Sequence, residues 1–215
     1  MSTSESASER AYAAIREGIL NGTHKPDTML GEAGLAAELG VSRTPVRAAL
    51  ARLQDEGWIT VYPKRGALVR GMSEKVVTDL ADARLILEGT GVQRATPQRR
   101  QALAERLAGD IDRQKQALAD GDLRQFVELT NAFHRSFVEA GDNLVMLELH
   151  DRLADRQRFL LFSFGDTLLG RSDAIIAEHE ELVARMRGDD GSAFVEVLRH
   201  HLGQTYGYDL RRLCP

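Results

Sequence analysis

The sequence has only one cysteine, few aromatic residues and no long apolar segment. The cysteine is Cys214, so no disulfide can form within the chain, and nothing in the composition indicates a secreted, disulfide-stabilised fold. The best apolar run, residues 159–162, is far shorter than the about 18 residues that a membrane helix needs. Residues 1–9 are serine-rich and acidic, unlike the basic start of a signal peptide. We therefore expect a cytoplasmic protein with no membrane partner.

The 215 residues allow one domain or two small ones, and the overall charge of −4 argues against a nucleic acid partner. The charge is unevenly spread, however. Residues 1–71 carry a net charge of +1 and residues 72–215 carry −5, while residues 41–70 hold six basic side chains against two acidic ones. A basic block in an acidic chain indicates a separate domain. We place the boundary near residue 71, giving domains 1–71 and 72–215.

Residues 1–71 predict three helices followed by a hairpin. Apolar spacing gives a first helix that stops at Asn21-Gly22, and a short second helix around Leu35 that Gly40 ends. Ser42 is a good N-cap for a third helix over 43–55, in which Val46, Leu50 and Leu53 form the buried stripe. Residues 58–61 and 67–69 are strand-like, with a basic turn at 63–66.

Two short helices joined by a turn that contains glycine suit DNA binding. Arg43, Thr44 and Arg47 lie near the start of the third helix and face away from its buried stripe, which is where a recognition helix reaches base edges in the major groove. Arginine offers a bidentate fork to guanine, and threonine can contact a thymine methyl group or a phosphate. The alternative is a solvated helix face with ordinary cations.

Residues 35–59, LAAELGVSRTPVRAALARLQDEGWI, resemble the winged helix-turn-helix of GntR-family bacterial transcription regulators, and residues 63–69, PKRGALV, resemble their wing. The resemblance implies that Arg43, Thr44 and Arg47 contact the operator and that Ser42 helps at the phosphates. It also implies that Gly66 lets the wing approach the minor groove. Many relatives carry arginine where this chain has Ala33, so either a contact is missing or Arg65 replaces it.

Residues 72–215 predict a bundle of six helices with no strand pattern. Breaks that contain proline or glycine place the helices at about 73–95, 98–119, 122–140, 143–163, 171–187 and 192–212. The fold class is therefore mainly α, with a winged helix-turn-helix before an antiparallel helical bundle.

Three histidines, His134, His179 and His201, lie on apolar helix faces of this bundle. A histidine that faces a core is neutral and hydrogen-bonded, or it binds something. Each one alone is more simply a satisfied core residue. Three on three helices point instead to a divalent metal such as zinc, nickel or manganese, with positions open for water or a small anion.

The bundle resembles the FCD ligand-binding domain of the FadR subfamily of GntR regulators, and its six-helix count resembles the VanR-like branch. Phe133-His134, Glu178-His179 and His201-Leu202 match the family's histidine motifs, and the spacing favours His201 over its neighbour His200. The family's fourth ligand, an Asp or Asn, is replaced here by Thr130, with Asn131 one residue later.

The same resemblance implies a ligand role for a charged pair on the first bundle helix. Arg84 and Glu88 lie one turn apart and match residues that many relatives carry there. Arg84 either clamps a carboxylate effector or forms an i, i+4 salt bridge with Glu88.

The favoured hypothesis is a DNA-binding repressor or activator that acts as a homodimer on a pseudo-palindromic operator and responds to a small carboxylate. One rival is a metal-dependent hydrolase or lyase that uses the three histidines. The sequence offers that rival little, because the position that a His-Glu-x-x-His motif requires holds Val183 and no phosphate loop or nucleophile elbow is present. A third possibility is a bundle that only dimerises the DNA-binding heads.

Overall fold

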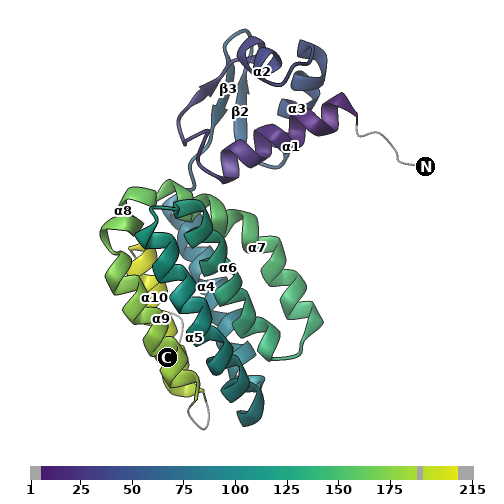
Figure 1. Cartoon of the computed structure of the whole chain (residues 1–215). Helices are drawn as coiled ribbons and strands as arrows, with labels where there is room; N and C mark the ends of the chain where they lie inside the picture. Colours follow the sequence, from purple (N-terminus) through teal and green to yellow (C-terminus); the bar gives the residue numbers. More distant parts are fainter. Residues whose placement is uncertain (1–5, 188–190, 208–215) are drawn as a thin grey trace, which may run out of the picture. The chain divides into compact units, whose positions relative to one another are not determined.

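The computed structural model describes residues 6–187 and 191–207 and divides the chain into two compact units, Met1–Met72 and Ser73–Pro215 (Figure 1). Cys214, the break at Gly188 and residues 208–212 of the last expected helix lie outside the described residues. Among the described residues, no helix is both long enough and apolar enough to cross a membrane.

The first unit contains three helices and a three-stranded antiparallel sheet in the order β1-β3-β2. Its elements are α1 (Ala7–Leu20), β1 (Met29–Leu30), α2 (Glu32–Glu38), α3 (Arg43–Asp55), β2 (Ile59–Tyr62) and β3 (Gly66–Val69). In the register, Leu30 pairs with Ala67 and Tyr62 pairs with Gly66. The three helices and the hairpin are confirmed. Strand β1 was not expected, because two residues are too few to show a period-two pattern.

The core of this unit forms around α3, which packs against α1, α2 and strand β2. The predicted stripe of α3 is confirmed, since Val46, Leu50 and Leu53 are buried. Burying this stripe leaves the opposite face of α3, near its N-terminus, exposed to solvent.

The second unit is helical throughout its described part. Its helices are α4 (Glu74–Arg94), α5 (Pro97–Ala119), α6 (Leu123–Ala140), α7 (Leu144–Ser163), α8 (Gly165–Gly170), α9 (Ser172–Met186) and α10 (Ser192–Tyr206). The six expected helices are present, and short α8 occupies the segment that Gly165 and Gly170 marked as a break. Side chains of Ser73, Thr96, Asp122 and Asn143 cap the N-termini of α4 to α7.

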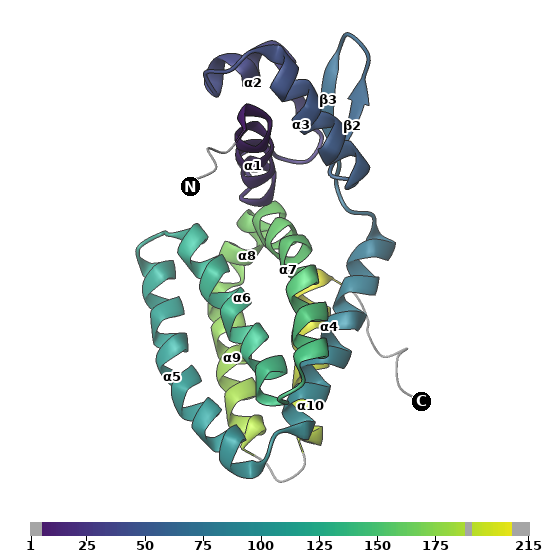
Figure 2. The ribbon, with the colours of Figure 1, turned by 90° about the vertical axis from the view of Figure 1, so that its right-hand side faces the viewer.

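Five of these helices form a closed ring in the order α4-α6-α5-α9-α10, and α7 packs against α6 and α4 (Figures 1 and 2). The axes of these helices are roughly aligned (Figure 2), so their inward faces line a single interior. Gly91 brings two of them unusually close, because a Cβ atom there would collide with the carbonyl oxygen of Phe137. This contact lies about one turn from Glu88 on α4 and from His134 on α6, and it brings those two side chains within reach of each other.

Candidate metal centre and DNA-facing helix

Three histidines from three helices of the ring meet in the interior of the bundle. His134 comes from α6, His179 from α9 and His201 from α10, and each is at most 3% exposed. Their candidate ligand atoms all lie within 4.8 Å of one another. The rings of His134 and His201 stack with centroids 5.1 Å apart, and Phe133 stacks on His179 at 4.5 Å. His201 is buried beside His134 and His179, whereas its neighbour His200 is exposed.

Each histidine is held by an acceptor at its Nδ1 atom. His134 Nδ1 lies 2.7 Å from Glu88 Oε2, His179 Nδ1 2.7 Å from Gln114 Oε1, and His201 Nδ1 2.7 Å from Glu178 Oε2. An oxygen acceptor at Nδ1 means that Nδ1 carries the proton, so each Nε2 presents a lone pair. This is the arrangement that orients histidines as metal ligands.

Burial favours the neutral forms of His134 and His179. Desolvation lowers the pKa of His134 to about 3, against the opposing attraction of Glu88. Desolvation also lowers the pKa of His179 well below its usual range, and repulsion from His201 adds to the effect. Burial by itself would raise the pKa of Glu88, but the adjacent Arg84 guanidinium holds it well below the usual value. Neutral imidazoles beside an ionised carboxylate are the protonation states that cation binding needs.

The residues present fit a divalent cation. His134 Nε2 and His201 Nε2 lie 3.2 Å apart, close to the roughly 3.3 Å that tetrahedral geometry with metal–nitrogen bonds of about 2.0–2.1 Å requires. His179 Nε2 is buried with no hydrogen-bond partner. Two lone pairs facing each other and a third left unpartnered are costly without a shared proton or cation. When bound, such a cation supplies positive charge and open positions for an anionic ligand.

The expected fourth position is less favourable. Thr130 lies one turn before His134 on α6, and its hydroxyl is buried without a partner. Asn131 is half-buried. A neutral threonine hydroxyl is a weaker ligand than a carboxylate, so the donor set in the interior is three histidines and at most one weak oxygen.

Further buried polar atoms without hydrogen bonds lie on α7. Both ring nitrogens of His150 and both side-chain polar atoms of Gln157 are buried without hydrogen bonds, although both residues are only 1% exposed. His150 Nε2 lies 3.6 Å from Glu88 Oε1, which is too far for a hydrogen bond. Buried polar atoms without partners are energetically costly, so a polar ligand or water is expected beside them.

Arg84 forms the salt bridge that was one of its two expected roles. Its Nε donates to Glu88 Oε1 at 2.7 Å, and its Nη1 donates to the Tyr206 hydroxyl at 2.6 Å. Glu88 accepts from Arg84 and His134 together, so the carboxylate connects the arginine to the histidine cluster. The role of Arg84 as an effector clamp stays a prediction.

The first unit places the expected DNA-facing residues on one exposed surface. Ser42, Arg43, Thr44 and Arg47 are all exposed at the start of α3. Ser42 occupies the N-cap position as expected, but its side chain makes no capping hydrogen bond. The hydroxyl and the first N–H groups of α3 are therefore available to an anion. Arg47 Nε donates to Glu32 Oε2 of α2 at 2.7 Å.

The wing is a tight basic turn. Lys64 has a positive φ of 63° at its tip, and Arg65 is exposed beside it. Gly66 has a φ of 117°, and a Cβ there would collide with the Leu30 carbonyl oxygen of β1. The structure thus gives Gly66 an internal role in the sheet, while its approach to DNA stays a prediction.

Several residues of the interior escaped the sequence analysis. Gln114 and Tyr206 contact members of the cluster or Arg84, and His150 faces Glu88. Only a buried polar residue in an otherwise apolar stripe, such as Gln114 on α5, gives a signal in the sequence. Pairing across helices depends on helix order and rotation, which spacing does not reveal.

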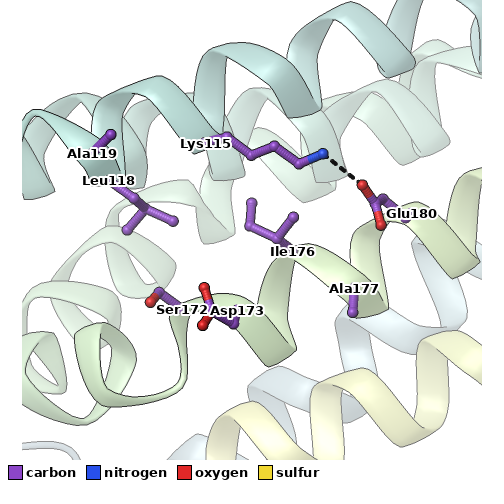
Figure 3. Close-up of a pocket in the computed structure, with 8 residues that line it drawn as sticks. All are labelled: Lys115, Leu118, Ala119, Ser172, Asp173, Ile176, Ala177 and Glu180. Atoms are coloured by element: carbon purple, nitrogen blue, oxygen red, sulfur yellow. Dashed lines mark hydrogen bonds and ion pairs between the residues drawn. The ribbon is translucent and has the colours of Figure 1, made fainter.

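The outer surface carries a groove between α5 and α9 that is separate from the cluster (Figure 3). Its volume is about 520 Å³, and its charged lining includes Lys115, whose Nζ donates to Glu180 Oε1 at 2.7 Å. None of the three histidines lines it. The side chains of Lys115 and Glu180 in this groove are about half exposed and are paired with each other.

Comparisons with known proteins match both units. Residues 7–69 match the family described as "Bacterial regulatory proteins, gntR family", and residues 79–204 match the FCD domain. The HTH-type transcriptional repressor RspR of Escherichia coli (strain K12) is 23% identical over 205 residues, covering 94% of this chain and 88% of that protein. The gluconate operon transcriptional repressor of Bacillus subtilis (strain 168) is 26% identical over 196 residues, covering 89% and 80%. A GntR transcriptional regulator from Rhodococcus sp. RHA1 of known crystal structure shares the fold, with a TM-score of 0.74, 21% identity and coverage of 94% and 97%.

Proposed function

Because the chain belongs to the GntR family of bacterial transcription regulators and carries an FCD domain, we propose that it is a repressor whose operator affinity is set by a small carboxylate bound inside the bundle. The family assignment makes it a DNA-binding regulator and answers the hydrolase or lyase alternative, since members and relatives are regulators rather than enzymes. The assignment as a repressor rather than an activator rests on the names of relatives. Placement in the VanR-like branch and in the cytoplasm stays a prediction.

The operator contacts follow from the exposed start of α3. Arg43, Thr44 and Arg47 read base edges in the major groove, and Ser42 with the first N–H groups of α3 holds a phosphate. Arg65 and Gly66 bring the wing to the neighbouring backbone or minor groove. The support is that Arg43, Thr44 and Arg47 are exposed to solvent while the apolar face of α3 is buried.

The effector site is the interior of the bundle. His134, His179 and His201 hold a divalent cation, and Thr130 or Asn131 supplies at most a weak fourth donor. The single observation that carries this proposal is the set of three Nε2 atoms with their Nδ1 atoms fixed by oxygen acceptors. Arg84 faces the same interior, where a carboxylate on the cation would compete with Glu88 for its guanidinium.

A homodimer completes the proposal, because a pseudo-palindromic operator requires two recognition helices. The second unit carries exposed apolar residues that a second copy would cover. Ile86 on α4 is 59% exposed, and on the adjacent α7 Leu144 is 75% and Val145 66% exposed. Effector binding then changes DNA affinity by favouring one of two dimer geometries.

Operator binding is tested by a gel-shift assay with the promoter of the protein's own gene at several salt concentrations. We expect a sequence-specific complex whose affinity falls steeply with salt. Arg47→Ala should cost about 1–3 kcal/mol of discrimination between the operator and a mutated site if Arg47 reads a base. Binding without sequence preference, or with little salt dependence, would contradict the proposal.

The effector site is tested with His179→Ala, using His200→Ala as the matched control because His200 is an exposed histidine outside the cluster. Metal content and the thermal shift on adding zinc should be lost in His179→Ala and kept in the control, while DNA binding persists in both. Unchanged metal content in His179→Ala would reject the site. Insensitivity of the wild type to chelator, metals and carboxylates would instead favour a bundle that only dimerises.

A further inference from the structure

A carboxylate stands beside the proposed base-reading arginine. Glu32 is the first residue of α2, and Arg47 lies in the second turn of α3. Arg47 Nε donates to Glu32 Oε2 at 2.7 Å, across the two helices of the helix-turn-helix. The Glu32 side chain is 30% exposed and that of Arg47 is 65% exposed, so the pair lies on the surface that faces DNA in the proposed function.

The atoms used in this bond leave the reading edge of the arginine free. A guanidinium has five N–H groups, and the bidentate pair that matches guanine O6 and N7 can be made by its terminal amino groups. Glu32 engages Nε, and in the part of the chain that the structure describes Arg47 has no other hydrogen bond or ion pair. The contact therefore fixes the side chain near its base while its outer edge faces solvent.

We propose that Glu32 is a positioning residue that holds Arg47 in the orientation in which its terminal edge meets a guanine. The inference rests on the proposed function, since it requires Arg47 to read a base. A long arginine side chain loses conformational freedom when it binds, and a partner that fixes it beforehand reduces that loss. Glu32 thus contributes to sequence discrimination without touching DNA.

A simpler effect of the same carboxylate predicts the opposite pattern. A negative charge on a DNA-facing surface repels phosphates and weakens binding to every sequence. Under that effect alone, removing the charge raises all affinities alike and leaves discrimination unchanged. Positioning instead lowers discrimination at one base pair, the one that Arg47 reads.

The test compares Glu32→Ala with Glu38→Ala. Glu38 lies on the same helix α2 and is exposed, and its replacement removes the same charge. Among the described residues it forms no hydrogen bond or ion pair with Arg47. Each base pair of the operator is changed in turn. The base read by Arg47 is the one whose change weakens binding of the wild type but not of Arg47→Ala. The readout is the ratio of affinities for the operator and for the site altered at that base.

We expect Glu32→Ala to reduce this ratio by about two- to five-fold, the range for an exposed ion pair. Glu38→Ala should leave the ratio unchanged, although both variants bind non-specific DNA slightly more tightly. Glu32→Gln, whose amide oxygen still accepts from Nε, should retain part of the discrimination. In an Arg47→Ala background, Glu32→Ala should have no further effect on the ratio.

Three results separate the possible failures. Equal ratios for Glu32→Ala, Glu38→Ala and the wild type would overturn the inference while leaving the proposed function intact. The same would follow if Glu32→Ala lowered discrimination at the other base pairs as much as at the one that Arg47 reads. A wild-type protein that shows no sequence preference would instead refute the proposed function itself.

Discussion

Glu88→Gln should destabilise the helical unit strongly, because it removes the charge that compensates a buried arginine. Arg84 and Glu88 form an i, i+4 pair on α4 with 4% and 0% side-chain exposure and an Nε–Oε1 distance of 2.7 Å. The Glu88 carboxylate also accepts from His134 at 2.7 Å. Glutamine preserves the shape of the side chain but leaves the Arg84 charge without a counter-ion in the interior.

The magnitude follows from burial rather than from distance. Removing one partner of a buried ion pair costs about 3–5 kcal/mol, since the remaining charge is desolvated and uncompensated. Lys75 and Asp79 provide the matched control, because they form an i, i+4 pair at 2.7 Å on the same helix with 80% and 58% exposure. Asp79→Asn should cost only about 0.3–0.5 kcal/mol.

The assay is urea unfolding of wild type, Glu88→Gln and Asp79→Asn, monitored by far-UV circular dichroism. Chelator is present throughout, so that metal binding does not contribute to stability. The double variant Arg84→Met/Glu88→Gln should recover much of the loss, because it removes the uncompensated charge. Equal costs for Glu88→Gln and Asp79→Asn would refute the reasoning. So would a double variant that is less stable than Glu88→Gln alone.

Two further predictions concern the wing and the pH dependence. Gly66→Ala should lower the free energy of unfolding by about 2–3 kcal/mol, because an alanine there is strained at positive φ and collides with Leu30. The control Gly34→Ala has open space around it, so thermal unfolding should show it to be neutral or stabilising. The pKa of His134 is lowered to about 3 and that of His179 is also lowered, so the unfolded chain binds protons that the folded one does not, and stability falls as the pH drops below 6.5. Between pH 7.5 and 5.5 the chelator-treated protein should lose about 1.4 kcal/mol through His134, with a further loss in the same direction through His179. A flat stability profile would contradict this.

Much of the fold could be predicted from the sequence because it rests on local chemistry. The stripe of Val46, Leu50 and Leu53 fixes which face of α3 is buried, and therefore which face reaches solvent. Ser42 marks the start of that helix, although its side chain leaves the N-cap unbonded. The spacing of the three histidines on apolar faces also identified the interior cluster. In each case the signal is a helical period or a chain-breaking residue, and neither depends on distant parts of the chain.

The partners of these residues could not be predicted, because they come from other helices. Glu88 holds His134 from α4, and Gln114 holds His179 from α5. The close approach of α4 to α6 depends on Gly91, which has no distinguishing mark in the sequence. Similarly, Glu32 reaches Arg47 only because α2 and α3 cross at one particular angle.

By itself the sequence identified a regulator of the GntR type, because the basic block at 41–70 predicted a separate first domain and the motif at 35–59 resembles a DNA-binding helix-turn-helix. Composition and the helical spacing of apolar residues are properties of single segments, so they can be read without knowledge of the fold. The tertiary structure alone decided that Arg84 is paired with Glu88 and Tyr206 and that each cluster histidine has its Nδ1 atom fixed by an oxygen. Those contacts depend on how five helices close into a ring, which is a property of the whole packed unit.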